Sequence, residues 1–120
     1  MTTDQVLDMQ AIETLRSLSP DDGGEFVREL IAIYLQDTPQ RLAEIQQALV
    51  QNDPVTLVRA AHSIKGSSGN FGATRLAQLA AEIEHQGKAG NLAALAAPSA
   101  LLKADYALVA QALEKISKGN

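Results

Sequence analysis

The sequence contains no cysteine and no tryptophan, and its only aromatic residues are two tyrosines and two phenylalanines. The absence of cysteine excludes disulfide bonds and thiolate metal sites, and two histidines alone cannot complete a zinc coordination sphere. We therefore expect no metal or cofactor in this chain. Few aromatic residues also argue against a sheet, because strands are enriched in aromatic and β-branched side chains. Alanine and leucine dominate the 46% hydrophobic fraction, which favours closely packed helices.

Long apolar segments and clusters of basic residues are also missing. No stretch approaches the roughly 20 apolar residues of a membrane-spanning helix, and the N-terminal MTTDQVLDMQ lacks the basic and apolar regions of a signal peptide. We therefore expect a cytoplasmic protein without membrane contacts. The net charge is -4 and the ten basic residues are spread along the chain, whereas affinity for nucleic acid requires clustered lysine and arginine. A nucleic-acid partner is not expected.

The 120 residues are enough for one domain, which we expect over 1–120. The spacing of apolar residues predicts helices over about 8–18, 25–51, 53–70, 74–86 and 91–116. Thr38-Pro39 is either a kink in the second of these helices or a cap with proline at the first position of a new helix, and we expect one long, bent helix. Pro98 is expected to bend or break the last segment. Four long amphipathic helices with short connections predict an all-α, up-and-down four-helix bundle with an additional short N-terminal helix across one end.

The stretch AAHSIKGSSGNFGA, residues 60–73, places a histidine on the helix expected over 53–70. At about 100° per residue, Ile64 centres a buried stripe of apolar and small residues, and His62 lies about 160° away, facing solvent. Gly66 and Gly69 follow on the exposed face, although each costs a helix about 1 kcal/mol relative to alanine. A bulky group that approaches the imidazole would explain the bare surface. Unwinding at the helix end is an alternative explanation for Gly69.

Lys65 lies one helical turn after His62 on the same face. A phosphoryl group on the imidazole would carry close to two negative charges, which this ammonium can pair. The same positive charge favours the neutral imidazole, whose lone pair can attack phosphorus. Taken alone, Lys65 would be an ordinary solvated side chain, and only its spacing from His62 indicates more.

The segment AHSIKGSSGNFGATRLAQLAAEIE, with FVRELIAIYLQDTPQRLAEIQQAL upstream, resembles the histidine-containing phosphotransfer (HPt) domains of multistep phosphorelays. The resemblance covers a core of about 7–117, and its most specific part is His-x-x-Lys-Gly followed by small residues and the Gly72-Ala73 turn. It implies that His62 accepts a phosphoryl group from a receiver-domain aspartate and passes it to another receiver. It also implies that Lys65 pairs with the phosphohistidine and that Gly66 admits the receiver's active site.

The resemblance also implies what the chain does not supply. Phosphoryl transfer is mostly positioning and charge neutralisation, so Mg²⁺ and the acidic residues can come from the receiver. We therefore expect a carrier, not an enzyme. The expected partners are receiver domains of response regulators or of a hybrid histidine kinase, bound by a monomer.

Glu84 is a departure from the family, because several members have a glutamine there that contacts the active histidine. A carboxylate at this position can accept the imidazole N–H and fix the ring tautomer, but it would repel a phosphoryl group. A solvated glutamate in the last turn of its helix is the alternative.

Val55, Val58 and Arg59 lie on the outer side of the helix with His62. Exposed apolar side chains beside a reactive group predict a transient docking patch, with Arg59 at its rim. Contact with the short first helix would also explain the two valines, and Arg59 alone would be a solvated side chain.

Other functions stay open at this stage. A helical interaction module could bind partners through the His62 face without phosphorylation. A kinase could also charge His62 directly from ATP, but it would lie elsewhere, since these residues contain no ATP-binding sequence. A metal enzyme in the bundle core is disfavoured, because the required Glu-x-x-His spacing occurs only once, at Glu82 and His85. We assign His85 no chemistry, since an imidazole in a last helical turn is favourable there anyway.

Overall fold

The computed structural model describes residues 3–119, with side chains described from residue 5 onward. Its elements are α1 (Thr3–Val6), α2 (Met9–Ser17), α3 (Glu25–Gln51), α4 (Pro54–Asn70), α5 (Thr74–Lys88), the 3-10 turn η1 (Leu92–Ala94) and α6 (Ala96–Gly119). No strand occurs in this part of the chain. The prediction of an all-α fold is confirmed. No helix within residues 3–119 is long and apolar enough to cross a bilayer.

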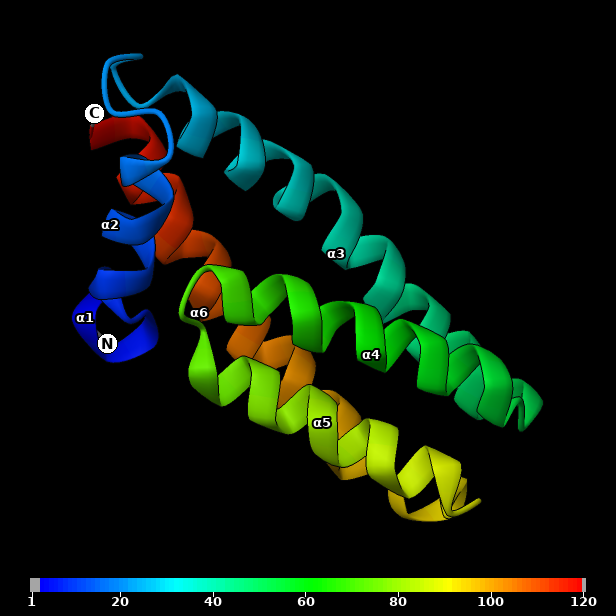
Figure 1. Ribbon diagram of the computed structural model, residues 1–120. Helices are drawn as coiled ribbons and strands as arrows, with labels where there is room; N and C mark the ends of the chain where they lie inside the picture. Colours follow the sequence, from blue (N-terminus) through cyan, green and yellow to red (C-terminus); the bar gives the residue numbers. More distant parts are fainter. Residues whose placement is uncertain (1–2, 120) are drawn as a thin grey trace.

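Helices α3 to α6 form the four-helix bundle, and α1 and α2 pack at the end where α4 turns into α5 (Figure 1). The backbone N–H of Asp8 donates a hydrogen bond to the carbonyl of Gly72 over 2.9 Å. Gly72 has a φ of +70°, and a Cβ there would lie 2.7 Å from the Asp8 carbonyl oxygen, so only glycine fits this contact. The prediction of a short N-terminal helix across one end is confirmed, whereas α1 is an additional turn that the sequence did not predict.

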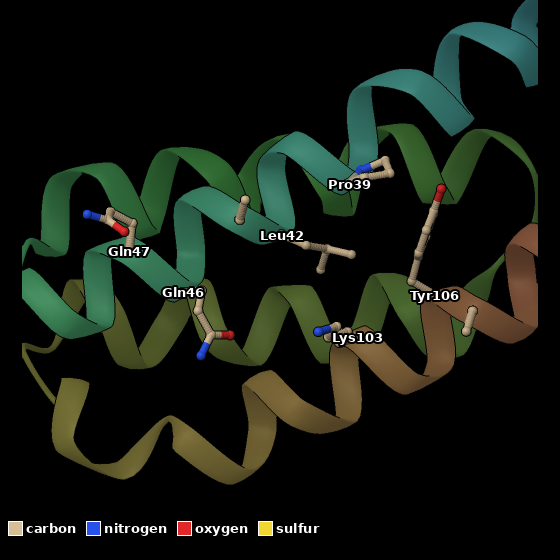
Figure 2. A pocket seen from close by; sticks show the side chains of 8 residues that line it. Pro39, Leu42, Gln46, Gln47, Lys103 and Tyr106 are labelled. Atoms are coloured by element: carbon tan, nitrogen blue, oxygen red, sulfur yellow. The ribbon is translucent and has the colours of Figure 1, made fainter.

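Local chemistry sets the boundaries of the central helices. The side chain of Asp53 accepts from the Thr56 N–H over 3.2 Å, and Pro54 occupies the first position of α4, as predicted. Helix α3 continues across Pro39, which confirms one long helix (Figure 2). The last predicted segment is interrupted before Leu102, but the break lies at Leu95, between η1 and α6, and not at Pro98. Because α6 begins at Ala96, Pro98 lies in the first turn, where its missing N–H has no intrahelical acceptor to lose.

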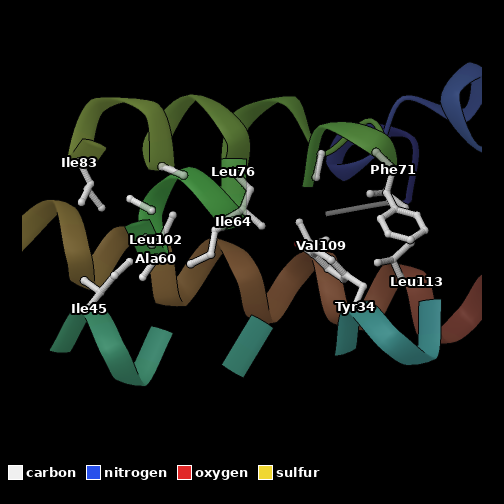
Figure 3. Packing of buried hydrophobic residues seen from close by; sticks show 14 of the residues in the cluster. Tyr34, Ile45, Ala60, Ile64, Phe71, Leu76, Ile83, Leu102, Val109 and Leu113 are labelled. Atoms are coloured by element: carbon white, nitrogen blue, oxygen red, sulfur yellow. The ribbon is translucent and has the colours of Figure 1, made fainter. Parts of the chain in front are cut away.

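The core is built from one buried stripe of each bundle helix (Figure 3). The ring centroids of Tyr34 and Phe71 are 5.1 Å apart, and the Tyr34 hydroxyl lies 2.7 Å from the Ser68 hydroxyl. Burial raises the pKa of Tyr34 above its ordinary value. Of the residues that helical geometry places within about 60° of Ile64, Leu57, Ala60, Ala61, Ser68 and Phe71 are buried as predicted. Ser67, also predicted on this face, is half-buried and donates to the Ser63 carbonyl over 2.9 Å. The buried stripe of α4 therefore leaves its opposite face, which carries His62, toward solvent.

Candidate functional site

His62 lies on the exposed face of α4, as the helical geometry predicts. Its side chain is 67% exposed, whereas Ile64, two residues later, is fully buried. The ring is therefore accessible from outside the bundle while its backbone is fixed by a packed helix. A second macromolecule can reach it without any rearrangement of the core.

Glu84 reaches His62 from the neighbouring helix α5. The Glu84 side chain is only 7% exposed, and its Oε2 lies 2.9 Å from Nδ1 of His62. Its other oxygen, Oε1, accepts a hydrogen bond from Nζ of Lys65 over 2.7 Å. The alternative of a solvated glutamate is therefore wrong, because the close packing of α4 and α5 brings this carboxylate into the site. A residue that fixes the tautomer of the imidazole requires the contact that Glu84 makes with Nδ1 of His62.

The protonation of this pair follows from its partners. The hydrogen bond from Lys65 is the largest cause that lowers the pKa of Glu84, and together with those from His62 and Lys88 it brings this pKa to about 2 against the opposing effect of burial. A carboxylate with this pKa is ionised at neutral pH and has no proton to donate. Nδ1 of His62 must therefore carry the hydrogen of the contact. In the neutral ring, Nε2 is then the nitrogen with the free lone pair.

The ammonium of Lys65 is bound to Glu84 and not to the ring of His62. The Lys65 side chain is 38% exposed and lies one turn from His62, so it is adjacent to any anion that forms on the ring. Its role as the partner of a phosphohistidine stays a prediction. In the absence of phosphate, its charge stabilises the carboxylate that orients the imidazole.

The exposed face beside His62 is open where the two glycines lie. A Cβ added to Gly66 or to Gly69 would meet nothing within 4 Å. Packing inside the chain therefore does not require glycine at either position. Helix α4 continues to Asn70, so Gly69 lies in its last turn. The helix unwinds only after this residue.

Val55, Val58 and Arg59 line a shallow groove that His62 and Glu84 also line. Val55 is 64% exposed, Arg59 is exposed, and Val58 is half-buried. Val58 packs against α5, since its Cγ2 would lie 2.9 Å from a Cβ on Gly87. The alternative that α2 covers these valines is wrong, because α2 lies at the opposite end of α4 (Figure 1).

Two residues of the site escaped the sequence analysis. Lys88 places Nζ 3.4 Å from Oε2 of Glu84 and lines the same groove; its i,i+4 spacing from Glu84 was the available signal. Gly87 lies in the last turn of α5, which ends at Lys88, two residues after the boundary predicted at about 86. A Cβ there would lie 2.5 Å from Cδ2 of Leu57, so glycine allows the close approach of α4 and α5 that buries Glu84.

A metal site is not visible within the described residues, where no group of three or more His, Cys, Asp or Glu side chains converges. The three cationic or N–H donors around Glu84 are instead His62, Lys65 and Lys88. These three groups hold the Glu84 carboxylate beside the imidazole.

Comparison with known proteins identifies the family of this chain. The family model of the Hpt domain matches residues 29–117. The chain belongs to the Hpt domain family. Members of this family are phosphotransfer intermediates of multistep phosphorelays, and this Hpt domain is one of them. The resemblance seen in the sequence is thereby confirmed.

Individual relatives agree with this assignment. The Hpt domain is 32% identical over 92 residues to the phosphorelay protein LuxU of Vibrio harveyi, with 77% of each chain covered. It is 28% identical over 83 residues to multistep phosphorelay regulator 1 of Schizosaccharomyces pombe, which covers 69% of this chain but only 28% of that protein. The crystal structure of histidine-containing phosphotransfer protein B from Pseudomonas aeruginosa PAO1 superimposes with a TM-score of 0.87 at 27% identity, covering 96% of both chains.

Proposed function

We propose that this Hpt domain accepts a phosphoryl group on Nε2 of His62 from the aspartyl phosphate of one receiver domain and passes it to an aspartate of another. The observation that carries this proposal is the 2.9 Å contact between Nδ1 of His62 and the buried, ionised Glu84. It leaves the lone pair of Nε2 on the exposed side of a ring that is 67% exposed.

Bonds and charges balance in the proposed transfer. The Nε2 lone pair attacks phosphorus, an N–P bond forms, and the bond between phosphorus and the receiver's aspartate oxygen breaks, which returns a carboxylate. The Nδ1 proton stays on the ring, which becomes cationic, and the adjacent Glu84 carboxylate stabilises that charge. Transfer to the second receiver is the reverse of this step.

The two lysines around Glu84 supply the neutralising charge for the phosphoryl group. Lys65 and Lys88 both reach the Glu84 carboxylate, so each lies within a short side-chain movement of the ring. Their movement from Glu84 to the phosphoryl oxygens would offset the repulsion that the carboxylate exerts on that group. Receivers would supply Mg²⁺ and the acidic residues, so the domain acts as a carrier and not as an enzyme.

The surface around His62 is suited to transient docking of a receiver. Gly66 leaves the approach to the ring open, and Val55 offers an exposed apolar contact with Val58 beneath it and Arg59 at the rim. We place the domain in the cytoplasm as a monomer, with receivers of response regulators or of a hybrid kinase as partners. Its net charge of -4 and dispersed basic residues argue against nucleic acid.

The test is transfer from labelled, phosphorylated receiver domains to the wild type and to two matched variants, His62→Gln and His85→Gln. His85 is the only other histidine of the chain, and it is exposed in the last turn of α5. Label that is stable in alkali and labile in acid is expected on the wild type and on His85→Gln, and no label on His62→Gln. A domain that binds receivers through this face but stays unlabelled is an interaction module, and the proposal is then wrong.

A further inference from the structure

A second concave surface lies between α3 and α6, away from the α4–α5 pair that carries His62 and Glu84. Figure 2 shows Pro39 and Leu42 of α3 facing Tyr106 of α6, with Gln46 and Lys103 beside them. The hollow has a volume of about 590 Å³, which is within the range of about 300–1,000 Å³ that is typical of binding clefts. The transfer reaction described above uses none of these residues.

The hollow continues toward the other end of the two helices. A neighbouring hollow of about 420 Å³ shares Gln46 and Lys103 with it and extends to Val50 and Ala96. We call the two together the α3–α6 groove. Its residues recur at intervals of three or four positions over twelve residues of each helix, from 39 to 50 and from 96 to 107. At 1.5 Å per residue this is about 17 Å, the length of a three-turn helix.

The lining of the groove combines small and apolar side chains with the polar Gln46, Gln47 and Ser99 and with Lys103. Ala96, Ala100 and Ala107 give the α6 side small side chains, and Val50 on the α3 side is 78% exposed. The apolar side chains lie on either side of Gln46 and Lys103, where the two hollows meet. An amphipathic helix laid into a groove buries an apolar stripe with the same three- and four-residue spacing.

Lys103 determines the charge of the partner. It is the only charged residue that lines the groove, it lies where the two hollows meet, and it forms no ion pair with any described residue. A two-fold dimer across the groove would bring two Lys103 side chains together with no lining carboxylate between them. The charge therefore favours an acidic partner over a second copy of this chain.

We propose that the α3–α6 groove binds an amphipathic helix of another protein that carries an Asp or Glu in the middle of its apolar stripe. The acidic side chain pairs with Lys103, and the apolar side chains fill the hollows on either side of it. Since the groove and His62 belong to different helix pairs, the helix and a receiver can bind at the same time. This proposal does not depend on phosphorylation of His62.

The probe is a surface-displayed library of 18-residue amphipathic helices, in which one central position of the apolar stripe is randomised. It is sorted against the purified 120-residue chain and against Lys103→Glu. Asp and Glu should be enriched at that position by the wild type, and Lys and Arg by Lys103→Glu. A selected acidic helix should bind about tenfold more weakly to Lys103→Glu. It should bind His62→Gln as well as it binds the wild type.

Substitutions of groove residues provide the matched control. Ala43, which is exposed, and Ala100 both line it, so Ala43→Gln with Ala100→Gln should fold normally and lose the selected helix. The proposal is overturned if no groove-dependent helix is recovered, or if the acidic preference is absent or survives Lys103→Glu. A dimer in sedimentation that Ala43→Gln disrupts, or a groove that binds decanoate but none of the helices, also overturns it.

Discussion

Substitutions of Gly66 should raise the stability of the domain and slow phosphoryl transfer. A Cβ at this position would meet nothing within 4 Å, and the backbone lies inside α4. Gly66→Ala should therefore raise the free energy of unfolding by about 0.5–1 kcal/mol, because alanine loses less backbone entropy in a helix than glycine. For a chain of this size, the melting temperature should rise by about 2–6 °C. Gly66→Gln should stabilise the domain similarly, since glutamine is also a good helix former.

Transfer from a phosphorylated receiver should change in the opposite direction. The glutamine side chain occupies the surface next to His62 that a receiver must approach, so its transfer rate should fall about tenfold, with a smaller fall for Gly66→Ala. Thermal unfolding and initial transfer rates on the same preparations measure both effects. The reasoning is refuted if Gly66→Ala destabilises the domain, since packing would then require the glycine, or if Gly66→Gln transfers at the wild-type rate.

Three further predictions concern stability and are measured by urea unfolding. Gly87→Ala should lower the free energy of unfolding by about 1–3 kcal/mol, because its Cβ would overlap Leu57 and Val58; an unchanged value would mean that α4 and α5 move apart freely. Glu84 has a folded pKa of about 2 against an ordinary 4.5, so the stability it contributes should be complete above pH 4.5 and lost as the pH falls toward 2. The difference between wild type and Glu84→Gln should shrink over that range, and a constant difference would contradict the assignment. Burial raises the pKa of Asp105, with Arg75 opposing it, so the stability linked to its neutral form is present in acid and lost as the pH rises through that pKa. Asp105→Asn should therefore be more stable than the wild type at pH 7 and lose this advantage in acid; a less stable variant at pH 7 would show that the charge is needed.

Helix positions could be predicted wherever the signals are local. The Asp53-Pro54 cap gives the start of α4, and the spacing of its apolar residues puts His62 on the exposed face. The end of α5 was predicted to within two residues, but the packing role of Gly87 could not be predicted, because a glycine near a helix end is usually a stop signal. Only the packing of Leu57 against Gly87 shows that this glycine is an interior contact.

Part of the site could be predicted from the sequence, but its contacts could not. The helical spacing was enough to place His62, Lys65 and Gly66 on the outward side of α4. The burial of Glu84 depends on how closely α4 and α5 approach each other, which no pattern within α5 reveals. The same tertiary contact decides that Lys65 rests on Glu84, whereas the contact of Lys88 with this carboxylate follows from their i,i+4 spacing within α5.

The most direct test of the account is the position of the phosphoryl group on the ring of His62. The domain is labelled with ¹⁵N-histidine and phosphorylated by a receiver, and the coupling between ³¹P and the ring nitrogens is measured by NMR. Because Glu84 holds the hydrogen on Nδ1, the account predicts a phosphoryl group on Nε2 of His62 and a proton on Nδ1. A phosphoryl group on Nδ1, or a His62 ring that stays unmodified while the domain carries label, would contradict it.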